Sequence, residues 1–176
     1  ATPGIDIGRP EEKLGLRASV TAAVSFSGCR VPSRQLLGTE GAGFKIALAT
    51  LDHSRLGIAA QAVGMHQRAL ELATAYASER VQFGKPIAAH QAIQFQLARM
   101  ATELAAARVL RWLAAASERS NAAGRLAAEA KAYASEAANR AVWDSLQIHG
   151  GNGYSEEYEI ARLYRDEALW SRISAA

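Results

Sequence analysis

The sequence predicts a mainly α fold, an antiparallel four-helix bundle preceded by a short β remnant. Alanine, which has the best helix propensity and a small radius, supplies 39 of the 176 residues. Apolar residues recur every three or four positions from Gly43 onward, whereas residues 1–40 show a period of two. With 49% hydrophobic and 21% charged residues, the composition is that of a globular protein and excludes disordered and collagen-like classes.

Residues 1–40 are expected to contain a half-buried strand. Apolar and polar side chains alternate there, and Pro32 and Gly38 bracket a short extended segment after it. Two or three short strands are marginal by themselves and leave unpaired edges, so this segment is expected to finish a β domain whose remainder lies outside the chain. Ala1 in place of Met agrees with a fragment. The alternating apolar positions are Val20, Ala22, Val24 and Phe26, between Ser19, Thr21 and Ser25.

Residues 41–176 are expected to form the four-helix bundle. The first apolar stripe continues for roughly 35 residues, or about 50 Å of helix. The turn Arg80–Pro86 ends it, and the glycine-rich segment Gly150–Gly153 ends the third helix. Short connections between neighbouring helices favour an antiparallel arrangement. In chain order, the expected helices run from Gly43 to about Tyr76, from Ile93 to about Ser120, from about Asn121 to Ile148, and from about Glu157 to Ile173.

Charge and cysteine content exclude several classes of function. The net charge is +3, and the basic residues are spread along the chain, so no nucleic-acid-binding face is indicated. The single cysteine, Cys29, cannot form an internal disulfide, which makes the cytoplasm the default location. The sequence has no apolar run of about 18 residues and no charged-then-apolar leader, so neither a membrane span nor a secretory signal is predicted.

Motifs for metal or nucleophilic chemistry are absent from the sequence. The four histidines lack metal-ligand spacing, and neither the GxSxG elbow nor the GxxxxGK phosphate loop occurs. No metal site is therefore predicted. Gly38, Gly41 and Gly43 precede the first long helix, where they either hold an anion with free amides or simply form a turn into the helix.

Two bends carry residues suited to a ligand. Arg80 and Phe83 are able to clamp a phosphate and a flat ring. On these residues alone, an Arg80 that satisfies the carbonyls at the helix C-terminus is the better interpretation. Gln147 has an amide that both donates and accepts, beside Gly150–Gly151, which admits a ligand against bare backbone. Helix capping by Gly150 explains the glycines about as well.

The order of these motifs resembles the second half of the acyl-CoA dehydrogenase family, over nearly the whole chain. Each motif is weak alone, whereas the joint pattern is highly specific. The early matches are Lys13-Leu-Gly-Leu-Arg17-Ala-Ser19-Val-Thr21, Phe26, Val31-Pro32, Leu37-Gly38-Thr-Glu-Gly41-Ala-Gly43-Phe44 and Leu51-Asp-His-Ser-Arg55. The later matches are Arg80-Val-Gln-Phe83-Gly84-Lys-Pro86-Ile87, His90-Gln91-Ala-Ile-Gln-Phe95, Gln147-Ile-His-Gly150-Gly151-Asn-Gly153-Tyr154 and Tyr164-Arg165-Asp166.

The resemblance implies an FAD-dependent oxidoreductase that removes two hydrogens across the α and β carbons of an acyl-CoA thioester. It implies electron transfer to an electron-transferring flavoprotein, and a tetramer whose subunits each have a helical, a middle β and a C-terminal four-helix domain. Residues 1–40 would then be the incomplete end of the middle β domain, and residues 41–176 the C-terminal domain. The resemblance implies that the FAD-binding residues largely serve the neighbouring subunit. They are expected to be Arg80, Phe83, Gln91, Gln147, Ile148, His149, Gly150 and Gly151. The expected acyl-CoA-binding residues are Asp52, His53, Ser54 and Arg55.

The catalytic base that the family uses has no counterpart in this sequence. The commonest family position holds a Glu, where this chain aligns Ser174 or, with a one-residue gap, Ala175. The other known position precedes the Arg that matches Arg55, and this chain has Ser54 there. Three hypotheses follow: a catalytically silent subunit in a mixed assembly, a base from outside the segment, or last residues that are not the native continuation. Carboxylates at the start of the fourth helix are better explained by the helix dipole than as a relocated base; they are Glu156, Glu157 and Glu159.

Three functional hypotheses therefore stand. The leading one is the C-terminal portion of an FAD-dependent acyl-CoA dehydrogenase, in a homo- or hetero-tetramer. The alternative is a silent helical subunit that completes the flavin site of a partner. A third is an isolated bundle that serves as a scaffold and binds no flavin.

Overall fold

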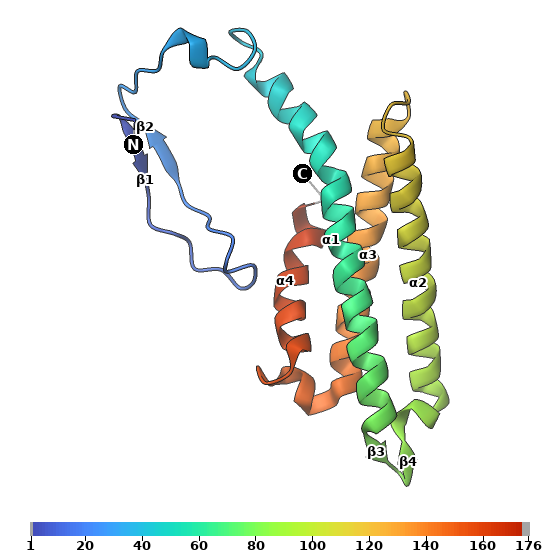
Figure 1. Ribbon diagram of the computed structural model, residues 1–176. Coiled ribbons are helices and arrows are strands. Elements are labelled where there is room, and N and C mark those ends of the chain that lie inside the picture. Colours follow the sequence, from blue (N-terminus) through green and yellow to red (C-terminus); the bar gives the residue numbers. More distant parts are fainter. Residues whose placement is uncertain (1, 174–176) are drawn as a thin grey trace. The chain divides into compact units, whose positions relative to one another are not determined.

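The computed structural model describes residues 2–173 and divides the chain into two compact units. The units are Ala1–Leu51 and Asp52–Ala176. The boundary falls inside α1, the first long helix, which covers Gly43–Glu79 (Figure 1). In the described part of the chain, no helix combines the length and the apolar character that crossing a membrane requires.

The first unit holds a two-stranded antiparallel ribbon, β1 (Ile5–Ile7) and β2 (Val24–Phe26). Ile5 faces Phe26 and Ile7 faces Val24. The expected strand exists only at its end, from Val24, and all of β2 is exposed, so the prediction of a half-buried strand is wrong. The alternating pattern needs a covering layer to bury its apolar face, and no described residue supplies one.

The segment between Pro32 and Gly38 was expected to be extended, and this prediction is also wrong. Ser33–Gln35 form a 3₁₀ turn instead. The amide of Gln35 donates to the Pro32 carbonyl at 2.9 Å, and the amide of Leu36 donates to Ser33 at 3.0 Å. Backbone groups without a partner strand are satisfied here by local hydrogen bonds.

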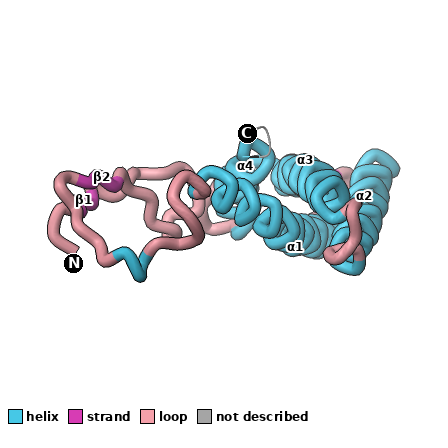
Figure 2. The backbone as a smooth tube through the Cα atoms, turned by 90° about the horizontal axis from the view of Figure 1, so that it is seen from above, coloured by secondary structure: helices cyan, strands magenta, loops and turns pink. Residues whose placement is uncertain are grey.

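The second unit is the predicted bundle of four antiparallel helices (Figures 1 and 2). After α1 come α2 (Gln91–Ala116), α3 (Ala123–His149) and α4 (Glu159–Ile173). The second helix ends at Ala116, before the expected position near Ser120, because the chain turns there and the Ser120 amide donates to the Ser117 carbonyl at 2.8 Å.

Alanine dominates the core of the bundle, as its abundance predicts. Small side chains let helices approach closely and interdigitate at crystal-like density. One cluster joins α1, α2 and α3 and includes Ala59, Ala62, Leu104, Ala107, Ala130 and Ala134. A second joins all four helices and includes Ala69, Ala73, Met100, Ala141, Val142, Ile160 and Leu163.

Two tight connections lie at the same end of the bundle, because the antiparallel order brings the C-terminal ends of α1 and α3 together (Figure 1). A hairpin of β3 (Val81–Gln82) and β4 (Lys85–Pro86) leads from α1 through a 3₁₀ turn to α2. A second 3₁₀ segment, Gly150–Tyr154, leads from α3 toward α4.

Candidate functional site

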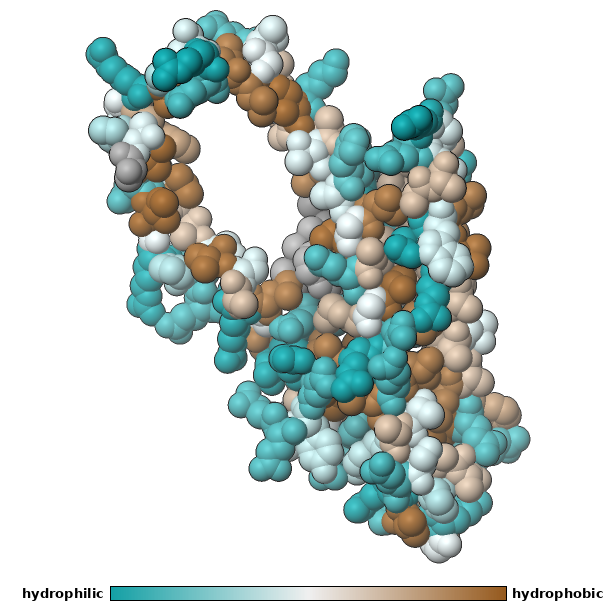
Figure 3. Space-filling view, viewed as in Figure 1, coloured by the Kyte–Doolittle hydropathy of each residue, from teal (hydrophilic) through white to brown (hydrophobic). Residues whose placement is uncertain are grey.

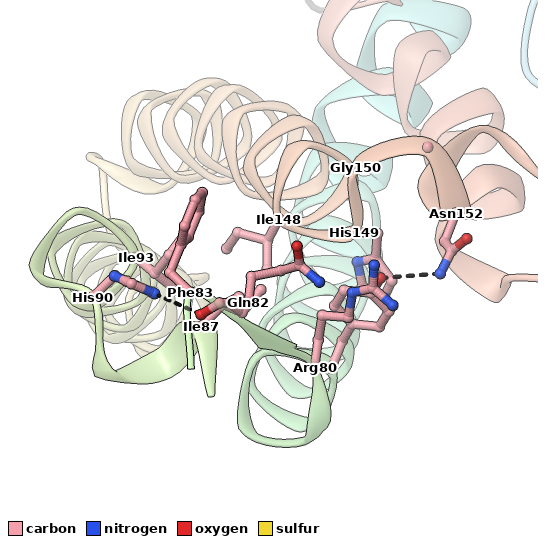
Figure 4. A pocket seen from close by; sticks show the side chains of 12 residues that line it. Arg80, Gln82, Phe83, Ile87, His90, Ile93, Ile148, His149, Gly150 and Asn152 are labelled. Carbon is pink, nitrogen blue, oxygen red and sulfur yellow. Dashed lines mark hydrogen bonds between the residues drawn. The ribbon is translucent and has the colours of Figure 1, made fainter. Parts of the chain in front are cut away.

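A pocket of about 580 Å³ opens at this end of the bundle (Figure 4). Three stretches of chain form it: the end of α1 with the hairpin after it, the approach to α2, and the end of α3 with the glycine turn. The lining residues are Tyr76, Arg80, Gln82, Phe83, Ile87, His90, Ile93, Ile148, His149, Gly150, Gly151 and Asn152.

Six of the eight residues expected to bind the cofactor line this pocket. They are Arg80, Phe83, Ile148, His149, Gly150 and Gly151. The other two, Gln91 and Gln147, are exposed and lie outside the lining, each next in sequence to a residue that belongs to it. The fold therefore joins the first bend and the third, which are about 70 residues apart in the sequence.

Arg80 follows the last residue of α1, and its backbone is tied at both ends. Its amide donates to the Tyr76 carbonyl at 2.9 Å, and its carbonyl accepts from the Ile87 amide at 2.8 Å. Among residues 2–168, whose side chains the structure describes, none forms a hydrogen bond or ion pair with its guanidinium. The alternative interpretation, in which this side chain donates to helix carbonyls, is therefore not supported by any hydrogen bond in the described part of the chain. An exposed guanidinium with five donors is suited to an anion.

Gly150 caps α3 and also leaves space in front of the turn. Its φ of 57° and ψ of −135° lie where a residue with a Cβ is strained, and its amide donates to the Gln147 carbonyl. A Cβ added at Gly150 or Gly151 would meet no atom within 4 Å, so the space beside both is open. The capping interpretation of Gly150 is correct.

His149 forms part of the pocket wall and is 5% exposed. Its ring stacks on Tyr76 at 4.3 Å between centroids and meets the edge of Tyr158 at 6.0 Å. Burial lowers the pKa of His149, so the ring is neutral at pH 7. Nδ1 lies 2.7 Å from the Ser145 carbonyl, and because a carbonyl only accepts, this nitrogen carries the proton.

Sequence reasoning missed several polar residues of the pocket. Tyr76 precedes Arg80 by one helical turn, and this i, i+4 spacing was the available signal. Asn152 follows the glycine pair, and its Nδ2 donates to the Tyr76 hydroxyl at 3.0 Å. His90 and Gln82 meet across the hairpin, with His90 Nε2 3.4 Å from the Gln82 carbonyl.

The charge of the pocket favours an anion. Arg80 is its one formal charge apart from histidine, and no carboxylate occurs among the lining residues. Elsewhere, no group of three His, Cys, Asp or Glu in the described ranges is placed to hold a metal ion.

The residues expected to bind acyl-CoA lie near the other end of α1. Asp52 Oδ1 pairs with Arg55 Nη1 at 2.7 Å. Asp52 and His53 line a smaller pocket of about 230 Å³ with the end of α2 and the start of α3, whereas Ser54 and Arg55 do not. At 1.5 Å per residue, Asp52 lies about 40 Å from Arg80 along the helix, which is farther than one extended dinucleotide reaches.

No catalytic base emerges at the expected positions. Ser54 is exposed on α1, and Ser174 and Ala175 lie outside the described residues. Glu159 pairs with Arg68 at 2.6 Å and Arg162 at 3.1 Å, and the bond from Arg68 lowers the pKa of this carboxyl. An ion-paired carboxylate at a helix start agrees with the dipole explanation.

Comparison with known proteins identifies the family. The model of the acyl-CoA dehydrogenase C-terminal domain matches residues 41–173. An acyl-CoA dehydrogenase of Bacillus subtilis (strain 168) is 51% identical over 166 residues, which make up 94% of this chain and 44% of that protein. Acryloyl-CoA reductase (NADH) of Anaerotignum propionicum is 48% identical over 169 residues, or 96% of this chain and 43% of that one.

A solved structure shows the same fold. Butyryl-CoA dehydrogenase from Megasphaera elsdenii matches with a TM-score of 0.94 and 42% identity, over 99% of this chain and 48% of that one. This chain thus spans less than half the length of these relatives. The fold, the matched domain and the identity over nearly the whole chain agree: the chain belongs to the acyl-CoA dehydrogenase family.

Proposed function

We propose that this chain is the C-terminal portion of an FAD-dependent acyl-CoA dehydrogenase-type oxidoreductase, which carries out α,β-dehydrogenation of an acyl-CoA thioester. The observation that carries the proposal is the single pocket that joins the Arg80 guanidinium to the Gly150–Gly151 turn. A bidentate cation beside unobstructed backbone is suited to the phosphates of a dinucleotide.

The residues present fit the diphosphate part of FAD. Arg80 offers side-chain donors that no described group uses, and the open space at both glycines lets a phosphate approach the backbone. Phe83, whose side chain is 93% exposed, offers a flat face beside the pocket. Gln91 and Gln147 would contact the cofactor from the rim.

The site is proposed to lie between subunits. The cofactor-binding and substrate-binding residues are about 40 Å apart along α1, so one flavin does not reach both within this chain. A pocket that serves the flavin of a neighbouring protomer removes this conflict. Apolar side chains are exposed on the bundle (Figure 3), and large ones on α2 are Phe95, Val109, Trp112 and Leu113. Such exposed apolar surface supports an oligomer, which we propose to be a homo- or hetero-tetramer.

The chemistry is divided between cofactor and chain. Bound FAD would accept the hydride that leaves the β carbon of the thioester. Asp52, His53, Ser54 and Arg55 would bind the acyl-CoA, while a base outside the described residues takes the α proton. The proposed electron acceptor is an electron-transferring flavoprotein, and the proposed location is the cytoplasm, with which the free Cys29 is compatible.

The exposed apolar side chains of the ribbon formed by β1 and β2 support the proposal that this chain is part of a larger protein. Ile7 and Phe26 are 69% and 70% exposed, so the ribbon presents apolar surface that another layer would bury. We propose that residues 1–40 end a middle β domain.

Cofactor binding is the first test. In the full-length protein, Arg80→Ala should weaken FAD binding by at least tenfold, because a charge-assisted contact is worth roughly 1.5–3 kcal/mol. Fluorescence titration of the apoprotein measures the Kd. Arg125→Ala is the matched control, since Arg125 pairs only with Glu129 on the surface of α3 among the described residues. Equal Kd values for Arg80→Ala and wild type would contradict the assignment.

Substrate oxidation is the second test. Anaerobic mixing of the flavin-loaded full-length protein with acyl-CoA thioesters should bleach the flavin absorbance. If the protein binds FAD but no acyl-CoA of any chain length bleaches it, the hypothesis of a silent subunit is favoured. If the protein binds no FAD, only the hypothesis of a scaffold bundle remains.

A further inference from the structure

The turn that carries Gly150 and Gly151 is restrained by a residue of α1. His149, just before the glycines, stacks on the Tyr76 ring at 4.3 Å with an interplanar angle of 27°. Asn152, just after them, donates through Nδ2 to the Tyr76 hydroxyl at 3.0 Å. One tyrosine therefore contacts both flanks of the glycine pair, with its ring on one side and its oxygen on the other.

The same tyrosine is coupled to Arg80. The Arg80 amide donates to the Tyr76 carbonyl at 2.9 Å, so the two residues occupy adjacent turns at the end of α1. Both line the pocket. Tyr76 thus connects the cationic half of the pocket to its glycine half.

The glycines need such a restraint. Gly150 and Gly151 have no side chains to pack, and the space beside them is open. Glycine also loses more conformational freedom on ordering than any other residue. The placement of this turn therefore depends in part on the residues that flank it.

We propose that Tyr76 and Asn152 are positioning residues, which hold the Gly150–Gly151 turn in register with Arg80 so that both halves of the pocket bind one diphosphate together. This inference rests on the proposed function, because the diphosphate is that of FAD. Neither residue has to touch the cofactor: the hydrogen bond between them orders the site before the ligand arrives, which lowers the entropy that binding has to offset.

The experiment measures FAD binding to the full-length apoprotein. Tyr76→Phe keeps the stack on His149 and removes the hydroxyl, so the Kd for FAD should rise by about three- to tenfold. The melting temperature of the apoprotein should change little. Tyr158→Phe is the matched control, since Tyr158 belongs to the same aromatic group but its hydroxyl has no hydrogen bond to any described residue. This control should bind FAD like wild type.

A double-mutant cycle separates positioning from a general loss of structure. If the bond between Tyr76 and Asn152 carries the effect, Tyr76→Phe combined with Asn152→Ala should weaken FAD binding no more than Asn152→Ala alone. Inorganic pyrophosphate, used as a competitor of FAD, should lose affinity in Tyr76→Phe by the same factor.

Two outcomes would overturn the inference. If wild type binds FAD and Tyr76→Phe binds it equally well, or if the two substitutions are additive, the positioning role is wrong while the proposed function stands. If wild-type protein binds no FAD, the proposed function fails, and this inference fails with it.

Discussion

Glu167 places a carboxyl in the interior of the bundle. Its side chain is 1% exposed, and neither oxygen has a hydrogen-bond partner among the described residues. Burial raises its pKa to about 8, and the nearby Lys131 opposes the shift without cancelling it. The carboxyl is therefore largely protonated at pH 7.

Because the pKa of Glu167 is raised in the folded protein, the free energy of unfolding depends on pH. Between about pH 4.5 and pH 8 the folded protein keeps a proton on Glu167 that the unfolded chain releases. The free energy of unfolding should therefore fall as the pH rises through this range.

Glu167→Gln removes this titration while keeping the shape of the side chain. The variant should be more stable than wild type at pH 8, by on the order of 1–3 kcal/mol, and should gain less at pH 5. Thermal unfolding at both pH values measures the difference. Glu156→Gln, which alters an exposed carboxyl, is the control and should show no such trend. A gain that is equal at pH 5 and pH 8 would contradict the assigned pKa.

At the level of elements, the hairpin after α1 holds an aromatic residue in a strained conformation. Phe83 and Gly84 have φ values of 53° and 77°, the pattern of a two-residue type I′ turn, for which Asn-Gly is preferred. A bulky residue with positive φ costs of order 1 kcal/mol, and such strain clusters at functional sites. The side chain is 93% exposed, so core packing does not account for it.

Phe83→Asn should therefore affect stability and binding in opposite directions. The free energy of unfolding of the variant should rise by about 1 kcal/mol, and its melting temperature with it. The variant should bind FAD more weakly, because the flat ring is lost. Calorimetry and FAD titration of the full-length protein measure the two effects. Gly84→Ala, which introduces a Cβ at φ 77°, should only destabilise. Unchanged FAD affinity in Phe83→Asn would show that the ring makes no contact with the cofactor.

At the scale of the whole molecule, the proposed site between protomers would link the retention of FAD to the assembly of the subunits. Flavin occupancy should fall when the full-length protein is diluted below its subunit dissociation constant, because FAD binds the assembled form. Gel filtration with simultaneous protein and flavin detection, over a range of concentrations, follows both quantities. A monomer that elutes with its full flavin content would contradict the shared site. Residues 1–176 alone should hold FAD poorly, because we propose that the rest of the middle β domain, which would surround the flavin ring, is needed as well.

The extents of the helices follow from the sequence to within a few residues. Apolar periodicity fixes them locally, and Gly43, Gly84 and Gly150 mark real starts, turns and ends. The strand around Val24 shows the limit of this reasoning. Its alternation predicts one buried face, but burial depends on a second layer that the pattern of one strand cannot reveal.

The candidate site was only partly predictable. The sequence indicates that Arg80 and the glycine pair are suited to a phosphate. It does not indicate a role for Tyr76 or Asn152, because these two residues meet only where the ends of α1 and α3 lie side by side. His66 and Glu167 are similar cases. His66 is buried with Nε2 2.9 Å from the Met100 carbonyl, a partner on α2 that the sequence of α1 alone does not indicate.

The sequence by itself determined the helices, the places where they end and the family, because helical period, turn residues and motif order are properties of short stretches of chain. Tertiary structure alone decided which helix ends meet and which polar groups lose their water. These features depend on contacts between residues tens of positions apart, and on the burial that such contacts impose on a charged or polar group.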